Sequence, residues 1–448
     1  MFEKVLIANR GEIALRVIRA CRELGIRSVA VHSTADAGSE VVRLADESVH
    51  IGPAPAPRSY LYVPNIVEAA RRTGADAVHP GYGFLSEDPY FAEICDDEGL
   101  TFVGPPPEVM RLVGDKATAR RLMAEAGLPL LPGTTEPVVD ADEAAAIADD
   151  IGYPVVLKAV AGGGGRGIAV VNDRADLPEI YQRVRAHAQQ VFGNGALYLE
   201  RYLRRARHVE VQVLADNHGA TIHLGDRDCS VQRRHQKLIE EAPSTAVDES
   251  LRAELGAVAV RGARSIGYRG AGTMEFLLDE DGAYWFMEMN ARIQVEHPVT
   301  EMVTGVDLVV EQLRLAAGLP LTIQQDQVVL RGHAIECRVN AEDPDRDFLP
   351  APGRLDVFVP PGGPGTRVDT HCRPGSTIPP TYDSLIAKVI VWAPDREAAL
   401  NRMDRALAEF RIEGPGVHTT IPFHRRVLEH PTFRKGDLAT DFLEKHMT

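Results

Sequence analysis

Lysine is scarce in this sequence, and its cysteines form no paired motif. Only seven lysines stand beside 42 arginines in 448 residues, so a lysine kept inside a motif is a candidate for a specific role. Lys116, Lys158, Lys237 and Lys388 lie in such segments. The five cysteines are scattered, with no C-x-x-C pair. That pattern argues against a disulfide framework and predicts reduced thiols in a cytoplasmic protein.

Further absences narrow the class of protein. No apolar run approaches the roughly 20 residues of a membrane span, and the first residues lack the apolar stretch of a signal peptide. The net charge of −15 predicts no nucleic-acid partner. The chain has no Gly-Lys dipeptide, which excludes a Walker A loop. Its first strand–helix turn reads A-N-R-G-E-I-A, so the dinucleotide fingerprint is also missing.

The first part of the chain alternates strands and helices. Over residues 1–110, short apolar strands are followed by amphipathic helices, which predicts a doubly wound, mostly parallel sheet. The turn H-P-G-Y-G-F-L-S-E (79–87) lies past a strand's carboxyl end, where such sheets bind ligands. Glu87 is therefore a functional candidate, although ordinary turn chemistry also explains this segment.

A glycine-rich loop lies between two strand-like runs in Y-P-V-V-L-K-A-V-A-G-G-G-G-R-G-I-A-V-V (153–171). Successive backbone N–H groups in such a loop can form an anion-binding nest. Lys158 ends the first strand, where it can reach a phosphate. The pattern predicts a mobile lid over ATP, with a flexible linker as the alternative.

Polar residues occupy every second position in Y-W-F-M-E-M-N-A-R-I-Q-V-E-H-P-V-T-E (284–301). Alternate residues of an extended chain point to one face, so Glu288, Asn290, Arg292, Gln294 and Glu296 are predicted to form one polar ridge. This mixture of acids, amides and an arginine favours a binding site. An edge strand with a salt-bridged surface is the alternative.

The ridge follows a predicted hairpin. Asp281-Gly282 lies between two β-rich runs, which indicates a two-residue turn. Equal spacing from that turn places Glu275 opposite Glu288. Directly opposed like charges destabilise a sheet unless a cation lies between them, and carboxylate and amide oxygens suit Mg²⁺. The sequence therefore predicts a metal site there, with Asn290 as a third ligand or an orienting residue.

Two more segments carry polar patterns. R-H-V-E-V-Q-V-L-A-D (207–216) alternates polar residues with valine, which predicts a half-buried strand. D-R-D-C-S-V-Q-R-R-H-Q-K-L-I-E-E-A-P (226–243) gathers basic residues in an otherwise acidic chain. That cluster is a candidate anion site, and a solvated loop is the alternative.

Taken together, the motifs resemble the biotin carboxylase family. In chain order they are K-V-L-I-A-N-R-G-E-I-A, H-P-G-Y-G-F-L-S-E, G-D-K, A-G-G-G-G-R-G, R-H-V-E-V-Q-V-L-A-D, R-D-C-S-V-Q-R-R-H-Q-K, E-M-N-A-R-I-Q-V-E-H-P-V-T-E, E-C-R-V-N-A-E-D-P and Y-D-S-L-I-A-K. The resemblance implies an α/β and α+β multidomain fold. Its parts would be an N-terminal doubly wound domain (1–113), a central ATP-grasp domain (114–328) with a lid over about 131–203, and a C-terminal α+β domain (329–448).

The resemblance also implies a role for each motif residue. The expected nucleotide-binding residues are Lys116, Lys158, Gly164, Gly165, Glu200, Arg201, Tyr202, Leu203, His208, Gln232, His235, Glu275, Leu277 and Glu288. Mg²⁺ or Mn²⁺ would be held by Glu275, Glu288 and Asn290. Bicarbonate would contact Lys237, Arg292, Gln294 and Val295, with Glu296 as the base, and Arg338 would face biotin. The expected catalytic group is Arg292, Glu296, Arg338 and Lys237.

The activity so implied is ATP-dependent carboxylation of biotin on a biotin carboxyl carrier protein, using bicarbonate and passing through carboxyphosphate. It would be the first half-reaction of acetyl-CoA carboxylase or a related acyl-CoA carboxylase, in fatty acid biosynthesis. Carboxyltransferase subunits would be partners, and the chain would form a homodimer. One alternative is another ATP-grasp ligase, which would not need the R-I-Q-V-E run with Arg338. The other is a non-catalytic nucleotide-binding regulator, which would not need Glu275, Glu288, Arg292 and Glu296.

Overall fold

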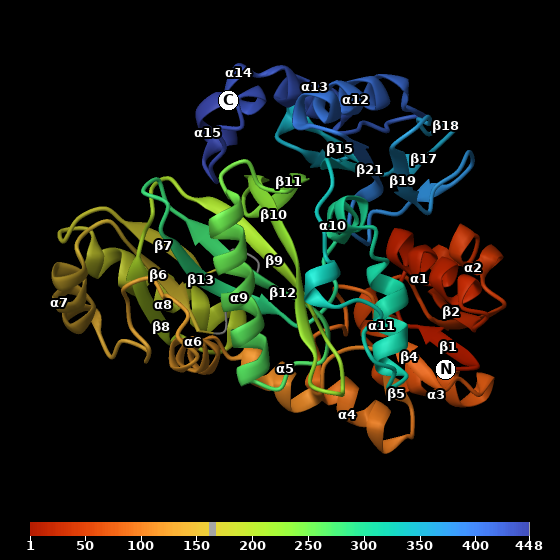
Figure 1. Ribbon diagram of the computed structural model, residues 1–448, viewed down its shortest axis with the longest axis horizontal. Coiled ribbons are helices and arrows are strands. Elements are labelled where there is room, and N and C mark those ends of the chain that lie inside the picture. The colour runs from red at the N-terminus through yellow and green to blue at the C-terminus, as the bar shows by residue number, and fades with distance from the viewer. Residues whose placement is uncertain (161–166, 448) are drawn as a thin grey trace.

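The computed structural model describes residues 1–160 and 167–447. Gly164, Gly165 and most of the loop expected to act as a lid lie outside the described residues. Figure 1 shows the N-terminal region at the right, a small sheet with its helices at the left, and the C-terminal region above. No helix in the described ranges is long and apolar enough to cross a bilayer.

The N-terminal region is the predicted doubly wound sheet. Its five strands are all parallel and lie in the order β3-β2-β1-β4-β5. The strands are β1 (Lys4–Ile7), β2 (Arg27–Ser33), β3 (Glu47–Gly52), β4 (Ala77–His79) and β5 (Thr101–Phe102), and the helices are α1 (Gly11–Glu23), α2 (Glu40–Leu44), α3 (Val63–Thr73), α4 (Pro89–Asp97) and α5 (Pro107–Gly114). Apolar residues of β1 and α1 are almost fully buried in a shared core, so the periodicity of the sequence fixes which face each element buries.

A separate small unit surrounds the glycine-rich loop. Its antiparallel sheet has the order β7-β6-β8, so the two strands predicted to flank the glycines are confirmed. The elements are β6 (Val155–Ala159), β7 (Ile168–Val171), β8 (Leu197–Arg201), α7 (Ala141–Ile151) and α8 (Leu177–Phe192). They enclose a core of their own. The preceding helix α6 (Lys116–Glu125) begins at Lys116, where the Asp115 side chain caps it by accepting from the Thr118 N–H.

One eight-stranded sheet continues from the central part of the chain into the C-terminal part, in the order β13-β12-β9-β10-β11-β14-β21-β19. Its strands are β9 (Arg207–Ala215), β10 (Thr221–Arg233), β11 (Gln236–Ala242), β12 (Gly270–Leu278), β13 (Tyr284–Asn290), β14 (His333–Asn340), β19 (Thr366–Thr370) and β21 (Leu385–Ala393). Because β11 pairs with β14, a division of the chain at residue 328 would cut this sheet, and the domain division stays a prediction.

Helices and short strands surround the large sheet. The helices are α9 (Glu249–Ser265), α10 (His297–Thr304), α11 (Leu308–Ala316), α12 (Arg396–Glu409), α13 (Ile421–Glu429), α14 (Pro431–Arg434) and α15 (Phe442–His446). The short strands are β15 (Glu342–Asp343), β16 (Leu349–Pro350), β17 (Gly353–Arg354), β18 (Val357–Val359), β20 (Thr377–Ile378) and β22 (Arg411–Glu413). A short connection separates α10, which ends at Thr304, from α11, which begins at Leu308.

The hairpin before the polar ridge is confirmed in its pairing and wrong in its turn. Glu275 pairs directly with Glu288, as predicted. Residues 279–283, rather than Asp281-Gly282 alone, connect the strands. A register shift beside Met287 compensates for the longer connection. The equal spacing therefore gave the right partners through two deviations that cancel.

Three other expectations need correction. The extended ridge ends with β13 at Asn290, and residues 291–296 form an irregular loop before α10, where Pro298 lies in the first turn. The strand at 207–216 is buried on both faces rather than one, because its valines lie in a core with α9 while Glu210 and Gln212 lie in a buried polar network with Arg227. The basic segment is largely a hairpin, β10 to β11, whose tight turn holds Arg234 and His235 at φ of 48° and 64°.

Candidate active site

Lys237 is the meeting point of three carboxylates. Its ammonium lies 3.2 Å from Oε1 of Glu275 and 2.7 Å from Oε1 of Glu296, and it also pairs with Glu210. Burial opposes the charge of the lysine, but the three acids outweigh burial and raise the pKa of Lys237 well above its ordinary value. Strands β9, β11 and β12 thus converge with the loop before α10 on one cation.

The opposed pair of the hairpin lies beside this lysine. Glu275 accepts from Asn290 Nδ2 at 2.7 Å and from Gln294 Nε2 at 3.0 Å, and its second oxygen lies 2.8 Å from His208 Nε2. Among the described residues, none makes a hydrogen bond or ion pair to the Glu288 carboxylate. Burial and the charge of Glu275 raise the pKa of Glu288. This carboxylate is therefore placed to accept a cation.

The loop after β13 is held from the N-terminal region. Arg292 donates to Glu87 (Nε–Oε2 3.0 Å), to Asn290 (Nη2–Oδ1 2.9 Å) and to Gln294 (Nη1–Oε1 2.8 Å). The other oxygen of Glu87 accepts from the backbone N–H of Ala291 at 3.0 Å. Glu87, the candidate from the turn at 79–87, thus anchors the loop that carries the predicted bicarbonate residues.

Glu296 lies between two cations at the end of that loop. Its Oε1 meets Lys237 and its Oε2 lies 2.9 Å from Arg338 Nη2, while the Cys229 thiol is 3.8 Å from Oε1. The carboxylate is completely buried. Burial alone would favour its neutral form, but Lys237 and Arg338 hold the pKa of Glu296 well below its usual range. A buried but ionised carboxylate is available as a base.

A second cationic group lies at the small unit around the glycine-rich loop. Lys158 of β6 pairs with Glu200 of β8, and Arg120 reaches the same carboxylate (Nη1–Oε1 2.7 Å). Burial opposes ionisation of Glu200, but Lys158, Arg120 and Lys116 lower its pKa. Lys116 also acts electrostatically on Glu288. The two predicted nucleotide lysines therefore both lie near Glu200, and Lys116 also lies near Glu288.

The structure does not join every predicted residue to this cluster. Arg201, Tyr202, Leu203, Gln232, His235 and Leu277 make no side-chain hydrogen bond or ion pair with it in the described chain. His235 lies at the exposed β10–β11 turn, and Arg201 ends β8 with its side chain exposed. Val295 contributes its backbone carbonyl, which accepts a hydrogen bond from Lys388 at 2.7 Å.

Several residues of the cluster were not identified from the sequence. Arg227 is completely buried and donates to Glu210 (Nη2–Oε2 3.0 Å), Gln212, Thr273 and Thr300. The missed residues are Glu12, Tyr82, Arg120, Glu210, Arg227, Cys229 and Glu240. Glu210 was visible as one of the alternating polar residues of 207–216, but nothing in its spacing indicated its partners Arg227 on β10 and Lys237 on β11.

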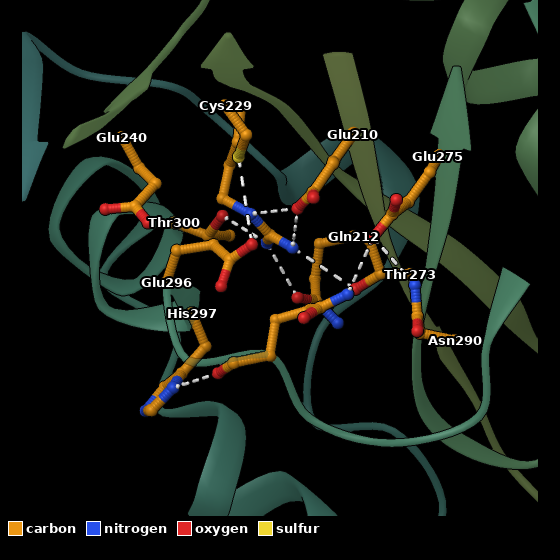
Figure 2. A network of polar contacts seen from close by, with 12 residues as sticks. Glu210, Gln212, Cys229, Glu240, Thr273, Glu275, Asn290, Glu296, His297 and Thr300 are labelled. Carbon is orange, nitrogen blue, oxygen red and sulfur yellow. Dashed lines mark hydrogen bonds and ion pairs between the residues drawn. The ribbon is translucent and has the colours of Figure 1, made fainter. Parts of the chain in front are cut away.

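The cluster has the groups needed for phosphoryl transfer to a small anion. Oxygen ligands suit a divalent cation, lysines and arginines can neutralise phosphoryl and bicarbonate charge, and an ionised carboxylate lies between Lys237 and Arg338. Figure 2 shows the carboxylates of Glu240 and Glu296 next to each other at one side of the network and Glu275 with Asn290 at the other. The site therefore has a cation-binding side and a base side.

Comparisons with known families give the same assignment along the chain. The biotin carboxylase N-terminal domain matches residues 1–110, and the biotin carboxylase C-terminal domain matches 336–445. Between them, residues 115–324 match the ATP-binding domain of the carbamoyl-phosphate synthase L chain. The three matches follow one another without overlap.

Individual relatives match over their full length. A biotin carboxylase of Nostoc sp. is 57% identical over 444 residues, 99% of each chain. A Campylobacter jejuni biotin carboxylase, solved as a β-γ-ATP complex, has a TM-score of 0.97 at 45% identity, covering 100% of this chain and 99% of its own. The biotin carboxylase domain dimer of Hydrogenobacter thermophilus 2-oxoglutarate carboxylase, solved with MgADP, ADP and bicarbonate, has a TM-score of 0.95 at 48% identity, covering 100% and 98%. The chain belongs to the biotin carboxylase family.

Proposed function

We propose that this chain uses ATP and bicarbonate to carboxylate the biotin of a carrier protein. ATP-dependent carboxylation of biotin is the activity that defines the family. The observation that carries the proposal is the placement of the fully buried Glu296 between Lys237 and Arg338, with Lys237 also reaching Glu275 of the Glu275–Glu288 pair. Neither a ligase for amines nor a non-catalytic regulator requires that arrangement.

The donor set at the hairpin fits Mg²⁺ or Mn²⁺. Glu275 and Glu288 would hold the ion, because the Glu288 carboxylate has no protein partner among the described residues and burial beside Glu275 raises its pKa. Asn290 would act as an orienting residue, since its oxygen accepts from Arg292 and its nitrogen donates to Glu275. A bound ion would neutralise charge on the transferred phosphoryl group.

Residues on the other side of the cluster would handle bicarbonate. Lys237 and Arg292 bring positive charge to the loop that carries Gln294 and Val295. Glu296 takes the bicarbonate proton while the bicarbonate oxygen attacks the γ-phosphorus and ADP leaves. The resulting carboxyphosphate breaks into CO₂ and phosphate, the phosphate takes the proton of the biotin ureido nitrogen, and that nitrogen attacks the CO₂. Lys116 and Lys158 would hold the phosphates of ATP, with Gly164 and Gly165 of the glycine-rich loop.

Arg338 would serve the second step. Its guanidinium lies between Glu296 (Nη2–Oε2 2.9 Å) and Glu240 (Nε–Oε1 2.5 Å). When the ureido nitrogen of biotin loses its proton, negative charge gathers on the ureido oxygen, and a fixed guanidinium stabilises that charge. Two buried carboxylates hold this donor in place before substrate arrives.

For the final acceptor we propose acetyl-CoA or a related acyl-CoA, so that the chain would supply malonyl-CoA for fatty acid biosynthesis in the cytoplasm. It would act as a homodimer with a biotin carboxyl carrier protein and carboxyltransferase subunits. A 2-oxoglutarate carboxylase is among the structural relatives, so 2-oxoglutarate is the competing candidate for the final acceptor. Carboxybiotin carrier made by this chain should yield product with an acetyl-CoA carboxyltransferase. Product only with a 2-oxoglutarate or pyruvate transferase would exclude the acyl-CoA role.

The activity itself is tested by the bicarbonate dependence of ATP cleavage. ADP release is followed in bicarbonate-depleted buffer with Mg²⁺ and free biotin, and bicarbonate is then added. We expect ADP release to rise with bicarbonate and carboxybiotin to form. ADP release that does not depend on bicarbonate, or that requires an amine instead, would refute the proposal.

A further inference from the structure

Lys388 is a buried lysine that the proposed function does not use. Its side chain is completely buried, although lysine is almost never fully buried without a partner. The ammonium donates to the backbone carbonyl of Val295 at 2.7 Å and lies 3.1 Å from Oε1 of Glu12. One side chain of β21 therefore joins helix α1 to the loop that carries Glu296.

The surroundings of Lys388 are charged on every side. On its own sheet Lys388 lies directly across from Arg338 on β14 and from Asp369 on β19. The charges of Glu336 and Arg367 affect the pKa of Lys388, and the charge of Lys388 lowers the pKa of His297. Helix α10 packs over the same face. From the N-terminal region, Glu12 also accepts from the Tyr82 hydroxyl. Three parts of the chain that are far apart in sequence thus meet at one ammonium.

The carbonyl that Lys388 holds belongs to the peptide between Val295 and Glu296. A peptide unit is planar, so fixing this carbonyl fixes the position of the Glu296 Cα, the point from which its side chain reaches into the site. Because Glu296 starts α10 as its N-terminal flanking residue and follows an irregular loop, no strand ladder would otherwise hold it. The backbone there depends on contacts from other elements.

We propose that Lys388, braced by Glu12, is a positioning residue that orients Glu296 as the base toward bicarbonate. This inference rests on the proposed function and adds a residue to it. A structural role alone would be served better by apolar side chains, because a buried ion pair is often matched or improved on by hydrophobic replacements. Lys388 donates a hydrogen bond to a backbone carbonyl of the loop that carries Glu296, and an apolar side chain could not make that bond.

The test separates the hydrogen bond to Val295 from the ion pair to Glu12. Lys388→Met alone leaves a buried carboxylate unpaired and can unfold the protein. The double variant Glu12→Gln/Lys388→Met removes both charges of this pair and keeps an acceptor for Tyr82, so it disturbs the fold less than the single change. Glu12→Gln alone keeps the Lys388–Val295 bond. Arg373→Met is the matched control, because Arg373 also ties the C-terminal region to the N-terminal region (Nε to Oε1 of Glu40, 2.7 Å) without touching the loop.

For each variant the melting temperature, the KM for ATP and the kcat of bicarbonate-dependent ATP cleavage are measured. We expect the double variant to melt near the wild type, to keep its KM for ATP within about twofold, and to lose roughly 10- to 100-fold in kcat, the range for one hydrogen bond to a charged group. Arg373→Met should stay within about threefold of wild type, and Glu12→Gln, which keeps the hydrogen bond to Val295 but weakens the brace, should fall between Arg373→Met and the double variant. A double variant with wild-type kcat, or one whose KM for ATP changes as much as kcat, would overturn the inference. A wild type without bicarbonate-dependent cleavage would refute the proposed function instead.

Discussion

Glu240 and Glu241 are neighbours on β11 that point to opposite faces of the sheet, and both are buried. On one face, Glu241 accepts from His333 Nε2 at 2.7 Å and from Arg396 Nε at 2.6 Å. Burial opposes its ionisation, but these partners hold the pKa of Glu241 at about 2. On the other face, Glu240 has one partner, Arg338, and one oxygen without any among the described residues. Burial raises the pKa of Glu240 to about 7.

The difference lies in how many carboxylates each cation serves. On the Glu241 face, one carboxylate has partners for both oxygens. On the Glu240 face, Arg338 is shared with Glu296, and Glu240 lies directly opposite Glu336, whose two buried oxygens have no partner in the described chain. A face on which buried carboxylates share one cation is poor for stability, and such perturbed groups are typical of functional sites. We infer that the two faces divide stability from catalysis.

Of the changes on the Glu240 face, Glu296→Gln should reduce activity the most, because it removes the base while keeping the side chain's shape. A general base is typically worth about 10²–10⁴-fold, so bicarbonate-dependent ATP cleavage should fall by that factor. ATP affinity should stay near wild type, since no phosphate-binding lysine is changed. Isothermal titration with ATP and ADP release with bicarbonate measure the two quantities. Cleavage at the wild-type rate would remove Glu296 from the mechanism.

Arg338→Ala should separate the two half-reactions. Carboxylation of biotin should fall hundreds-fold, in line with about 10²–10³ for one donor to a developing oxyanion, while ATP cleavage with bicarbonate persists. ADP and carboxybiotin are measured on one preparation. A common fall of both activities would show that Arg338 maintains the whole site, and its role toward biotin would then be wrong.

Sequence reasoning reached the parts of the molecule that local rules govern. The parallel N-terminal sheet and the strands beside the glycine-rich loop follow from periodicity. The Glu275–Glu288 pairing was reached with a turn that was itself wrong, because the longer connection and the register shift cancel. The loop after Asn290 was missed, because alternation alone cannot show where a strand loses its ladder partner. The pairing of Arg338 with both Glu240 and Glu296 joins segments up to 98 residues apart, and no spacing rule spans such a distance.

Glu241→Gln should cost stability without costing activity. It weakens charge-assisted bonds to His333 and Arg396, which are typically worth about 1.5–3 kcal/mol. Because the pKa of Glu241 is lowered from 4.5 to about 2, its stabilisation is complete above pH 4.5 and lost as pH falls toward 2. Urea unfolding at pH 7 and at low pH should show a deficit that shrinks on acidification. A folded variant that loses more than about threefold in kcat would contradict the division between the faces.

Glu240→Gln should have the smallest effect and the opposite pH dependence. The pKa of Glu240 rises from 4.5 to about 7, so between these values the native state keeps a proton that the unfolded chain has lost. Native stability therefore falls as pH rises through this window, and Glu336, whose pKa burial also raises, acts in the same direction. Urea unfolding at several pH values between 5 and 7.5 should show a shallower decline for Glu240→Gln and a still shallower one for Glu240→Gln/Glu336→Gln. Glu241→Gln is the control, because its window lies below pH 4.5 and it should keep the wild-type slope here. Unchanged slopes in both Glu240 variants would mean that Arg338 keeps Glu240 ionised throughout, and the two faces of β11 would then differ in geometry but not in charge.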